Sequence, residues 1–231
     1  MKLTLIGSCV AVCFCLAAGA QTDFANAVKA GTRKLKARYP DAAGARADFS
    51  RALELAETAN QTARAIAGVA DSFYVGRDPE KGRAEDAKIL AMTDISPGLK
   101  VDAQLRIAES FMGYRFPAAP DYAAARAEYR KVLTMPGASA DQGVKAMFGL
   151  AGAFAVDKMY AEARAEYAKV LATEDATLEQ KLEARYSIGS NYRAEGDFEN
   201  ARAEFAKILQ MQGVSPEFRE VVEERLRTIY R

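Results

Sequence analysis

Apolar and small residues recur along this chain at a fixed long interval. Three segments match closely, Tyr122–Leu133 (YAAARAEYRKVL), Tyr160–Leu171 (YAEARAEYAKVL) and Phe198–Leu209 (FENARAEFAKIL), and they begin 38 residues apart. Two weaker copies precede them, Ala45–Leu53 (ARADFSRAL) and Gly82–Leu90 (GRAEDAKIL). Within each copy the apolar positions fall three and four residues apart, which places them on one face of a helix. A fixed period of this length indicates a repeat architecture.

A second pattern precedes the later copies: an apolar residue, a small residue, and an aromatic residue three positions further on. It occurs at Val69-Ala70 with Phe73, Ile107-Ala108 with Phe111, Leu150-Ala151 with Phe154, and Ile188-Gly189 with Tyr192. This spacing also lies along one helical stripe. Each unit is therefore predicted to be two helices, joined in the last full copy by a tight turn at Gly196-Asp197. One helical pair cannot bury such a face alone, so the units must stack.

The repeated positions suggest how the helices pack. Small residues at Ala125, Ala163 and Ala201 allow the second helix of a pair to approach the first closely. One leucine recurs in all five copies and is predicted to form a continuous buried spine: Leu53, Leu90, Leu133, Leu171 and Leu209.

The last full unit resembles the tetratricopeptide repeat, through Ile188-Gly189, Tyr192, Gly196, Phe198, Ala201 and Phe205. The resemblance extends from about Ala42 to the end of the chain. It implies an all-α fold, a right-handed α-solenoid of about five helix–turn–helix repeats with a C-terminal capping helix. Two features depart from the family: the period is 38 residues rather than about 34, and Gly213 lies where a proline is usual. A related solenoid with longer helical arms is the alternative.

The first 20 residues have the layout of a secretory signal peptide. Lys2 precedes an apolar run over Leu3–Leu16, and small residues up to Ala20 precede polar Gln21. Cleavage after Ala20 would export a helical domain of residues 21–231 to the periplasm or the extracellular space. It would also leave a protein that is not integral to a membrane. An uncleaved anchor is the alternative; lipidation at Cys9 is disfavoured because most of the apolar run follows it.

Three further segments carry expectations. Thr22–Arg38 is predicted to be a helix that begins near Thr22, and Pro216–Arg231 a capping helix. In the cap, Arg227 occupies a position that is small in the other units. Tyr114–Asp121 is an insertion between two helices, and it is either a loop that contacts a partner or a neutral surface insertion.

Composition argues against catalysis, and the charge balance points to no particular class of partner. The chain has 32 basic and 31 acidic residues, so nothing favours nucleic acid or an anionic membrane. It has no histidine, and its three cysteines all precede residue 21, so the usual nucleophile triads and zinc sites lack their residues. Carboxylates one turn apart, Glu162 with Glu166 and Glu179 with Glu183, are an acid–base or metal candidate or an ordinary charged surface. The surface interpretation is favoured, and no enzyme activity or cofactor is predicted.

The resemblance implies that a partner lies in a groove lined by the first helix of each pair. The candidate groove residues are Arg64, Asp71, Tyr74, Leu105, Glu109, Met112, Lys145, Phe148, Tyr186, Ser190 and Arg193, beside Ala67, Asp102, Gly152, Ala155 and Glu183. Aromatic side chains there are either partner anchors or core residues. The predicted function is an interaction scaffold that binds a protein or peptide. The alternatives are a glycan- or small-molecule-binding protein and a carboxylate-based enzyme.

Overall fold

The computed structural model describes residues 6–113 and 119–230, and within these the side chains from residue 21 onward. This part of the chain contains helices and no strand. The helices are α1 (Ile6–Leu35), α2 (Ala42–Glu54), α3 (Ala59–Val75), α4 (Pro79–Ala91), α5 (Pro97–Ser110), α6 (Tyr122–Thr134), α7 (Ala140–Val156), α8 (Tyr160–Ala172), α9 (Leu178–Glu195), α10 (Phe198–Gln210) and α11 (Pro216–Arg227).

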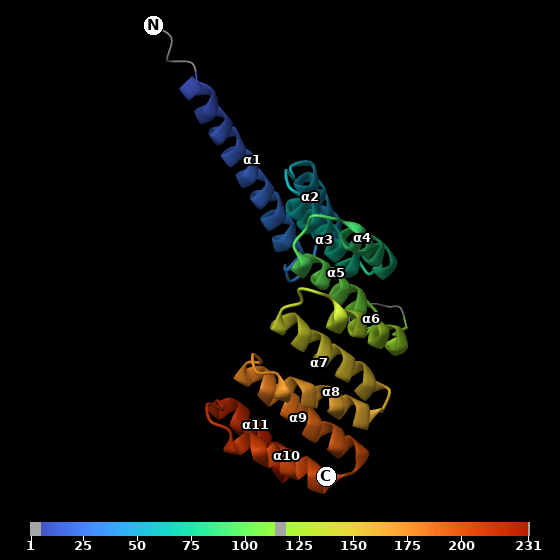
Figure 1. The fold of residues 1–231 in the computed structure, drawn as a ribbon. Coiled ribbons are helices and arrows are strands. Elements are labelled where there is room, and N and C mark those ends of the chain that lie inside the picture. The colour runs from blue at the N-terminus through green and yellow to red at the C-terminus, as the bar shows by residue number, and fades with distance from the viewer. Residues whose placement is uncertain (1–5, 114–118, 231) are drawn as a thin grey trace. The chain divides into compact units, whose positions relative to one another are not determined.

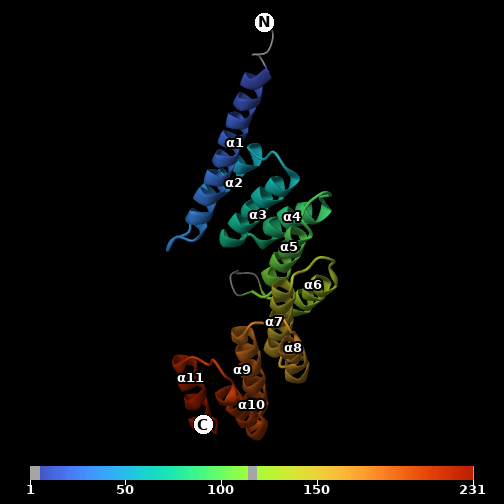
Figure 2. The same cartoon turned by 60° about the vertical axis from the view of Figure 1, so that its left-hand side comes forward.

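The helices form two compact units, one containing α1 to α5 and the other α6 to α11. Within each unit, consecutive helices pack side by side as hairpins (Figures 1 and 2). The first helices of successive pairs also touch, α1 with α3, α3 with α5 and α7 with α9. Within the described residues, the second helices of a unit do not touch one another. Each unit therefore has two layers, one of first helices and one of second helices. We call the surface of the first-helix layer that faces away from the second helices the inner face of the unit.

The sequence specifies where most helices begin. Asp41, Asp78, Asp121 and Asp197 each accept a hydrogen bond from the backbone N–H three residues on, at the start of α2, α4, α6 and α10. Three first helices start with a reciprocal capping box, formed by Thr58 with Gln61, Ser139 with Gln142, and Thr177 with Gln180. These contacts satisfy backbone donors that a helix leaves unpaired at its N-terminus.

The turns inside three helical pairs share a positive φ angle at one position. The predicted turn at Gly196-Asp197 is confirmed, and Gly196 ends α9 with φ 86°. The corresponding positions in the other turns are Arg77 with φ 66° and Lys158 with φ 60°. Left-handed backbone is strained for residues that carry a Cβ atom. Two of these turns therefore hold an unfavourable residue at a position suited to glycine.

The predicted leucine spine is wrong by one residue. Leu53 is 40% exposed, and the other four leucines are partly buried. The residues just before them are almost completely buried: Ala52, Ile89, Val132, Val170 and Ile208. Each residue turns a helix by about 100°, so a shift of one position moves a side chain from the centre of the packed face to its edge.

The aromatic residue of the second helix lies deep in the packing. Phe49, Tyr129, Tyr167 and Phe205 are all buried, with exposures from 0% to 8%. A Cβ atom added to Gly68 would lie 2.2 Å from the Phe49 ring, and one added to Gly149 would lie 2.1 Å from Tyr129. The Phe49 and Tyr129 rings therefore rest against bare backbone on the following first helix, whereas the Phe205 ring rests against Gly189 on the first helix of its own pair.

Both terminal predictions need correction. The helix predicted to begin near Thr22 is the end of α1, which starts at Ile6 and ends at Leu35. The predicted cap exists as α11, but it ends at Arg227 rather than continuing to residue 231. Ile229, just beyond it, is fully buried. The predicted signal peptide lies outside the described residues apart from the α1 backbone, as does most of the Tyr114–Asp121 insertion.

We expect Ile89→Ala to lower the free energy of unfolding by about 2–5 kcal/mol, because it empties a packed site that is 1% exposed. The matched control is Leu53→Ala in the same unit, which should cost at most about 1 kcal/mol because Leu53 is 40% exposed. Urea unfolding followed by circular dichroism measures both. Equal losses would contradict the revised register.

We expect Lys158→Gly to stabilise the second unit and Gly196→Ala to destabilise it. Left-handed backbone costs a residue with a Cβ atom about 1–2 kcal/mol. An added Cβ at Gly196 meets no atom within 4 Å, so the effect there is free of steric clash. Thermal unfolding of the two variants should shift the melting temperature in opposite directions; shifts of the same sign would refute the backbone argument.

Candidate functional site

The first unit presents only part of the predicted groove. Arg64 and Glu109 are exposed, and Asp71 is half-buried, on the inner face of α3 and α5. Tyr74 and Leu105 are instead buried, at 7% and 5% exposure. Tyr74 turns away from the inner face toward α4 and donates a hydrogen bond to Asp86, so it does not serve as a partner anchor in this conformation.

In the second unit the predicted anchors pack against their own helices. Phe148 contacts Tyr167 edge-on, with 5.6 Å between the ring centroids. Tyr186 lies 5.3 Å from the Phe205 ring and 5.9 Å from the Phe218 ring. These contacts favour the alternative that the two aromatic residues are part of the core.

The remaining predicted residues of the second unit are divided between surface and interior. Lys145 is exposed, Ser190 and Arg193 are half-buried, and Met112 is 3% exposed. The buried Nε atom of Arg193 has no hydrogen-bond partner among the described residues. Because Met112 and Leu105 are almost completely buried, both are core residues rather than groove residues.

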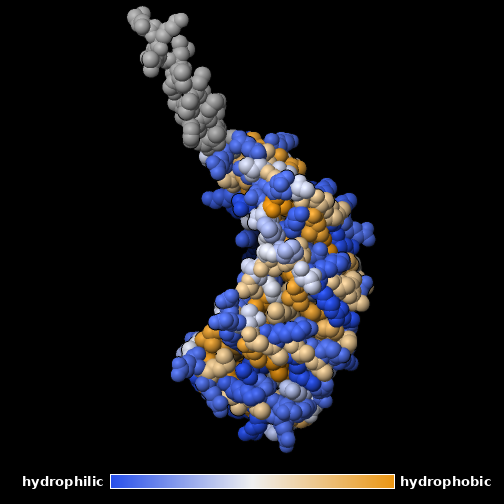
Figure 3. Space-filling model, in the orientation of Figure 1, coloured by the Kyte–Doolittle hydropathy of each residue, from blue (hydrophilic) through white to orange (hydrophobic). Residues whose placement is uncertain are grey.

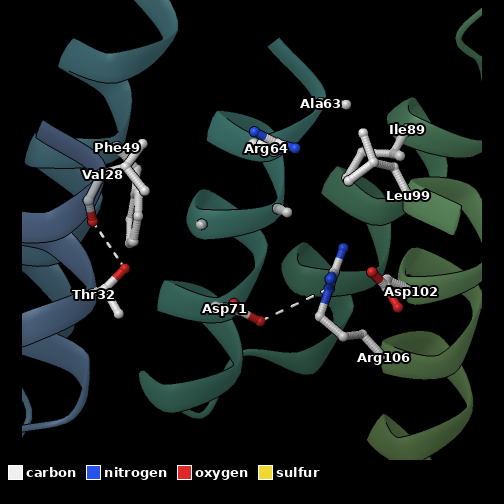
Figure 4. A pocket seen from close by; sticks show the side chains of 12 residues that line it. Val28, Thr32, Phe49, Ala63, Arg64, Asp71, Ile89, Leu99, Asp102 and Arg106 are labelled. Atoms are coloured by element: carbon white, nitrogen blue, oxygen red, sulfur yellow. Dashed lines mark hydrogen bonds and ion pairs between the residues drawn. The ribbon is translucent and has the colours of Figure 1, made fainter. Parts of the chain in front are cut away.

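A pocket of about 200 Å³ lies on the inner face of the first unit, between α1, α3 and α5 (Figure 4). Four residues of the wider predicted groove set line it: Arg64, Ala67, Asp71 and Asp102. The rest of the lining is mainly apolar, with Arg106 as the other charged residue: Val28, Thr32, Phe49, Ala63, Gly68, Ile89, Leu99 and Arg106. The structure thus gathers charged residues of α3 and α5 around a small depression.

The pocket exists because one position of α3 is small. Ala67 corresponds in the repeat to Leu105, Phe148 and Tyr186 on the other first helices. Phe148 and Tyr186 pack on the aromatic rings of their own second helices, whereas position 67 contributes only a small side chain to the lining of the pocket. The neighbouring Gly68 cannot fill it either, because its backbone is covered by the Phe49 ring.

Arg106 is held at one side of the pocket by a buried carboxylate. Its Nη2 and Nε atoms donate to Oδ1 of Asp86 at 2.5 Å and 3.0 Å. Asp86 is completely buried, and its Oδ2 atom also accepts a hydrogen bond from the Tyr74 hydroxyl at 2.9 Å. The Arg106 guanidinium also lies near Asp71 on α3, with 3.8 Å between Nε of Arg106 and Oδ1 of Asp71. The guanidinium is therefore fixed in place by contacts beneath the pocket.

Burial dominates the electrostatics of this cluster. It raises the pKa of Asp86 to about 6, and the charge of Arg106 and the hydrogen bonds from Arg106 and Tyr74 limit the rise. Burial and the adjacent Asp86 carboxylate also raise the pKa of Tyr74, so its hydroxyl stays protonated and donates. The Asp86 carboxylate raises the pKa of Arg106, which remains charged.

Sequence reasoning missed Arg106, although the repeat contained a signal for it. Asp86 stands where the other four copies have Phe or Tyr, and Arg106 stands where Gly68 and Gly149 lie on α3 and α7. An acidic residue at a core position needs a partner. In the same copy Gly82 replaces an alanine, and a Cβ there would lie 2.5 Å from the Tyr74 ring. These substitutions form one connected cluster.

The other charged candidates behave as surface residues. Glu166 forms an ion pair with Lys169 at 2.7 Å, so it does not act with Glu162 as an acid–base pair. Equivalent Glu–Lys ion pairs recur on α4, α6 and α10. The described side chains contain no group of three acidic residues arranged to hold a metal ion. On the face drawn in Figure 3, hydrophilic and hydrophobic residues are interspersed.

Comparison with known proteins adds no family: no family model matches the chain, and no curated protein matches it significantly. Among the described residues, none of the helices combines the length and the apolar character needed to cross a membrane. The tetratricopeptide resemblance therefore depends on the repeated residues alone.

We expect Asp86 to make stability depend on pH between about 4 and 6. With its pKa raised from 3.8 to about 6, the folded protein keeps a proton in this range that the unfolded chain has released. The free energy of unfolding should therefore fall as pH rises through the window, by up to about 3 kcal/mol from this group, and change little from it above pH 6.

The variant Asp86→Asn should flatten this part of the pH profile, measured by urea unfolding at pH 4, 5, 6 and 7. Glu85→Gln on the same helix is the control, because Glu85 is paired with Lys88 near the surface. Parallel profiles for the parent chain and Asp86→Asn would contradict the assignment.

Proposed function

We propose that this chain is an exported scaffold protein that holds a segment of a partner protein on the inner face of its helical repeats. The observation that carries the proposal is the pocket between α1, α3 and α5, which is lined by apolar residues and by four charged ones, Arg64, Asp71, Asp102 and Arg106. A small opening with a few polar groups around an apolar base is the usual form of a recognition site.

The size of the pocket favours a peptide over a glycan or another small molecule. A cavity of about 150 Å³ binds a molecule as small as benzene, whereas sites for drug-sized ligands usually reach about 300–1,000 Å³. At about 200 Å³, the pocket suits a single amino-acid side chain. A partner segment would then lie along the inner face and insert one residue here.

The repeat supports a tetratricopeptide-type solenoid, right-handed as in that family, with helical pairs longer than usual. Export is supported by the layout of the first 20 residues and by the position of Phe24. Phe24 is the first buried side chain described in α1, and it packs with Ala27, Ala52 and Ala65. Cleavage after Ala20 would leave this packing in place.

A binding role also fits the titratable groups better than catalysis does. The pKa of Asp86 is raised toward neutrality, a property often found in acid–base catalysts. It is completely buried and paired with Arg106 and Tyr74, so no substrate can reach it. We therefore propose no enzymatic activity and no cofactor.

We expect Ala67→Leu to abolish partner binding without unfolding the chain, because leucine fills the pocket and already occupies the equivalent position of α5 as Leu105. A photo-crosslinking residue at position 64, on the pocket lining, would report contact in the cell envelope of the native host. The yield of the crosslinked protein should fall at least about tenfold in Ala67→Leu, equivalent to about 1.4 kcal/mol.

The matched control is Ala47→Leu, the same substitution at an exposed position of α2, which should leave the yield unchanged. Circular dichroism should show equal helix content for both variants. If Ala67→Leu retains its crosslinked partner, the pocket is not the binding site; if the bound species is a glycan or metabolite, the alternative function applies.

A further inference from the structure

Basic side chains are concentrated near the end of α1, although the chain as a whole is almost neutral. Residues 24–40 contain five basic residues and no acidic one: Lys29, Arg33, Lys34, Lys36 and Arg38. Cations are favourable in the last turn of a helix, but that accounts only for Arg33 and Lys34. The near-zero net charge of the chain therefore conceals a local positive excess.

Three of these residues form one exposed row. Lys29, Arg33 and Lys36 are four and three residues apart, a spacing that places them on the same side of a helix. The helical turn continues past the end of α1, because the backbone N–H of Lys36 donates to the Thr32 carbonyl at 3.1 Å. All three residues are exposed, and so is Arg38 just beyond them. We call Lys29, Arg33, Lys36 and Arg38 the basic surface.

The basic surface differs from the neighbouring Lys34, whose charge is offset. Nζ of Lys34 lies 2.7 Å from Oδ2 of Asp48 and donates to the carbonyl of Gly44. Among the described residues, no acidic side chain forms an ion pair with any member of the basic surface. Arg38 instead lies over Tyr39, 5.8 Å from the ring centroid, and Tyr39 is 82% exposed. Four cations and an aromatic ring are thus presented to solvent together.

The basic surface lies at an outer edge of the first unit. α1 packs against α2 and α3, and its contacts include Phe24 and Ala27 (Figure 1). The pocket on the inner face is lined on α1 by Val28 and Thr32, and by no member of the basic surface. A flat partner can therefore contact this edge of the unit and leave the inner face open.

The basic surface suits a broad anionic partner. Its cations lie along the outside of a helix, which is convex, so they do not enclose a single acidic side chain. The headgroups of an anionic bilayer need no enclosure, because each Lys or Arg near such a surface strengthens binding by about fivefold. Exposed Tyr39 fits the same partner, since tyrosine is favoured at membrane–water interfaces. An acidic protein segment would depend on a well-packed interface core, which a row of exposed basic side chains does not offer.

We propose that the basic surface attaches the protein to the surface of a membrane that contains anionic phospholipids, with α1 against the headgroups. The attachment is peripheral and electrostatic, because the apolar side of this part of α1 is already covered by α2 and α3. The inference goes beyond the proposed function, since it involves none of the residues that line the pocket. The scaffold would hold its partner on the inner face while the α1 edge rests on the membrane.

The test measures cosedimentation of the exported protein, as purified from its host, with lipid vesicles. One kind of vesicle contains phosphatidylglycerol and phosphatidylcholine in equal amounts, and the other contains phosphatidylcholine alone. Binding to the anionic vesicles should be at least about tenfold tighter in about 0.1 M salt. It should fall to the level of the neutral vesicles in about 1 M salt, because the screening length shrinks from about 10 Å to about 3 Å. A retained apolar N-terminal segment would raise binding to both kinds and so cancels in the comparison.

A triple variant locates the attachment. Lys29→Gln, Arg33→Gln and Lys36→Gln together remove three charges from the basic surface. Binding to the anionic vesicles should weaken at least about tenfold. The free energy of unfolding, measured with urea, should stay close to that of the parent chain, because all three residues are exposed.

The matched control is a second triple variant, Arg51→Gln with Lys145→Gln and Arg202→Gln. It removes three exposed charges from three separate helices, so both triple variants have the same net charge. Vesicle binding of the control should weaken at most about twofold, because charges far from the bilayer are screened. The difference between the two variants reports the position of the cations rather than their number.

Three results would contradict the proposal. The first is equal binding to the two kinds of vesicle. The second is an equal loss of binding in the two triple variants, which would show attraction by net charge alone. The third is displacement of the protein from the anionic vesicles by a decaglutamate peptide at an equal concentration of negative charge, which would identify an acidic polypeptide as the partner. Crosslinking from position 64 tests the proposed function separately.

Discussion

In each unit, one close contact joins a helical pair to the next: the aromatic ring of a second helix lies against bare backbone on the following first helix. Phe49 against Gly68 in the first unit and Tyr129 against Gly149 in the second make this contact, since neither glycine has room for a Cβ atom. A helical pair cannot bury its apolar face by itself, and this contact joins one pair to the next. The short distance it requires brings the first helices together and creates the inner face.

At one junction of the first unit the same contact is made by charged residues. Asp86 replaces the ring and Arg106 replaces the glycine, and the two form a buried ion pair. Such a pair often contributes no more to stability than a hydrophobic contact of similar volume, because both charges lose their hydration. The exchange therefore matters less for stability than for chemistry. The Arg106 guanidinium is fixed beside the pocket, and the buried Asp86 carboxylate offsets most of its charge.

The sequence was informative wherever a structural feature repeats. The paired helices and the aspartate caps follow from residues that recur at equivalent positions, and the turn at Gly196 follows from the glycine itself. The register of the core did not follow, because positions 89 and 90, or 208 and 209, are both apolar. Periodicity alone cannot decide which of two adjacent apolar residues lies at the centre of a packed face.

The errors at the site have a different physical origin. Tyr74 was expected at the surface, and its true direction depends on space above Gly82 and a hydrogen bond to Asp86, both on another helix. Arg106 was overlooked because a charged residue on a helix is normally a surface residue. The deviation of Asp86 from the aromatic pattern was the one clue in the sequence that a compensating charge must lie nearby.

Large aromatic side chains on the first helices were expected to anchor a partner, but in the second unit they belong to the core. Large residues on the first helices, Phe148 and Tyr186, turn back onto the rings of their own second helices. They complete the core and fill the space that a partner would use. Ala67, at the equivalent position of the first unit, is small and lines the pocket instead. On a scaffold whose backbone repeats, a recognition site can arise where a side chain becomes smaller, and the charged residues around the opening then determine what enters.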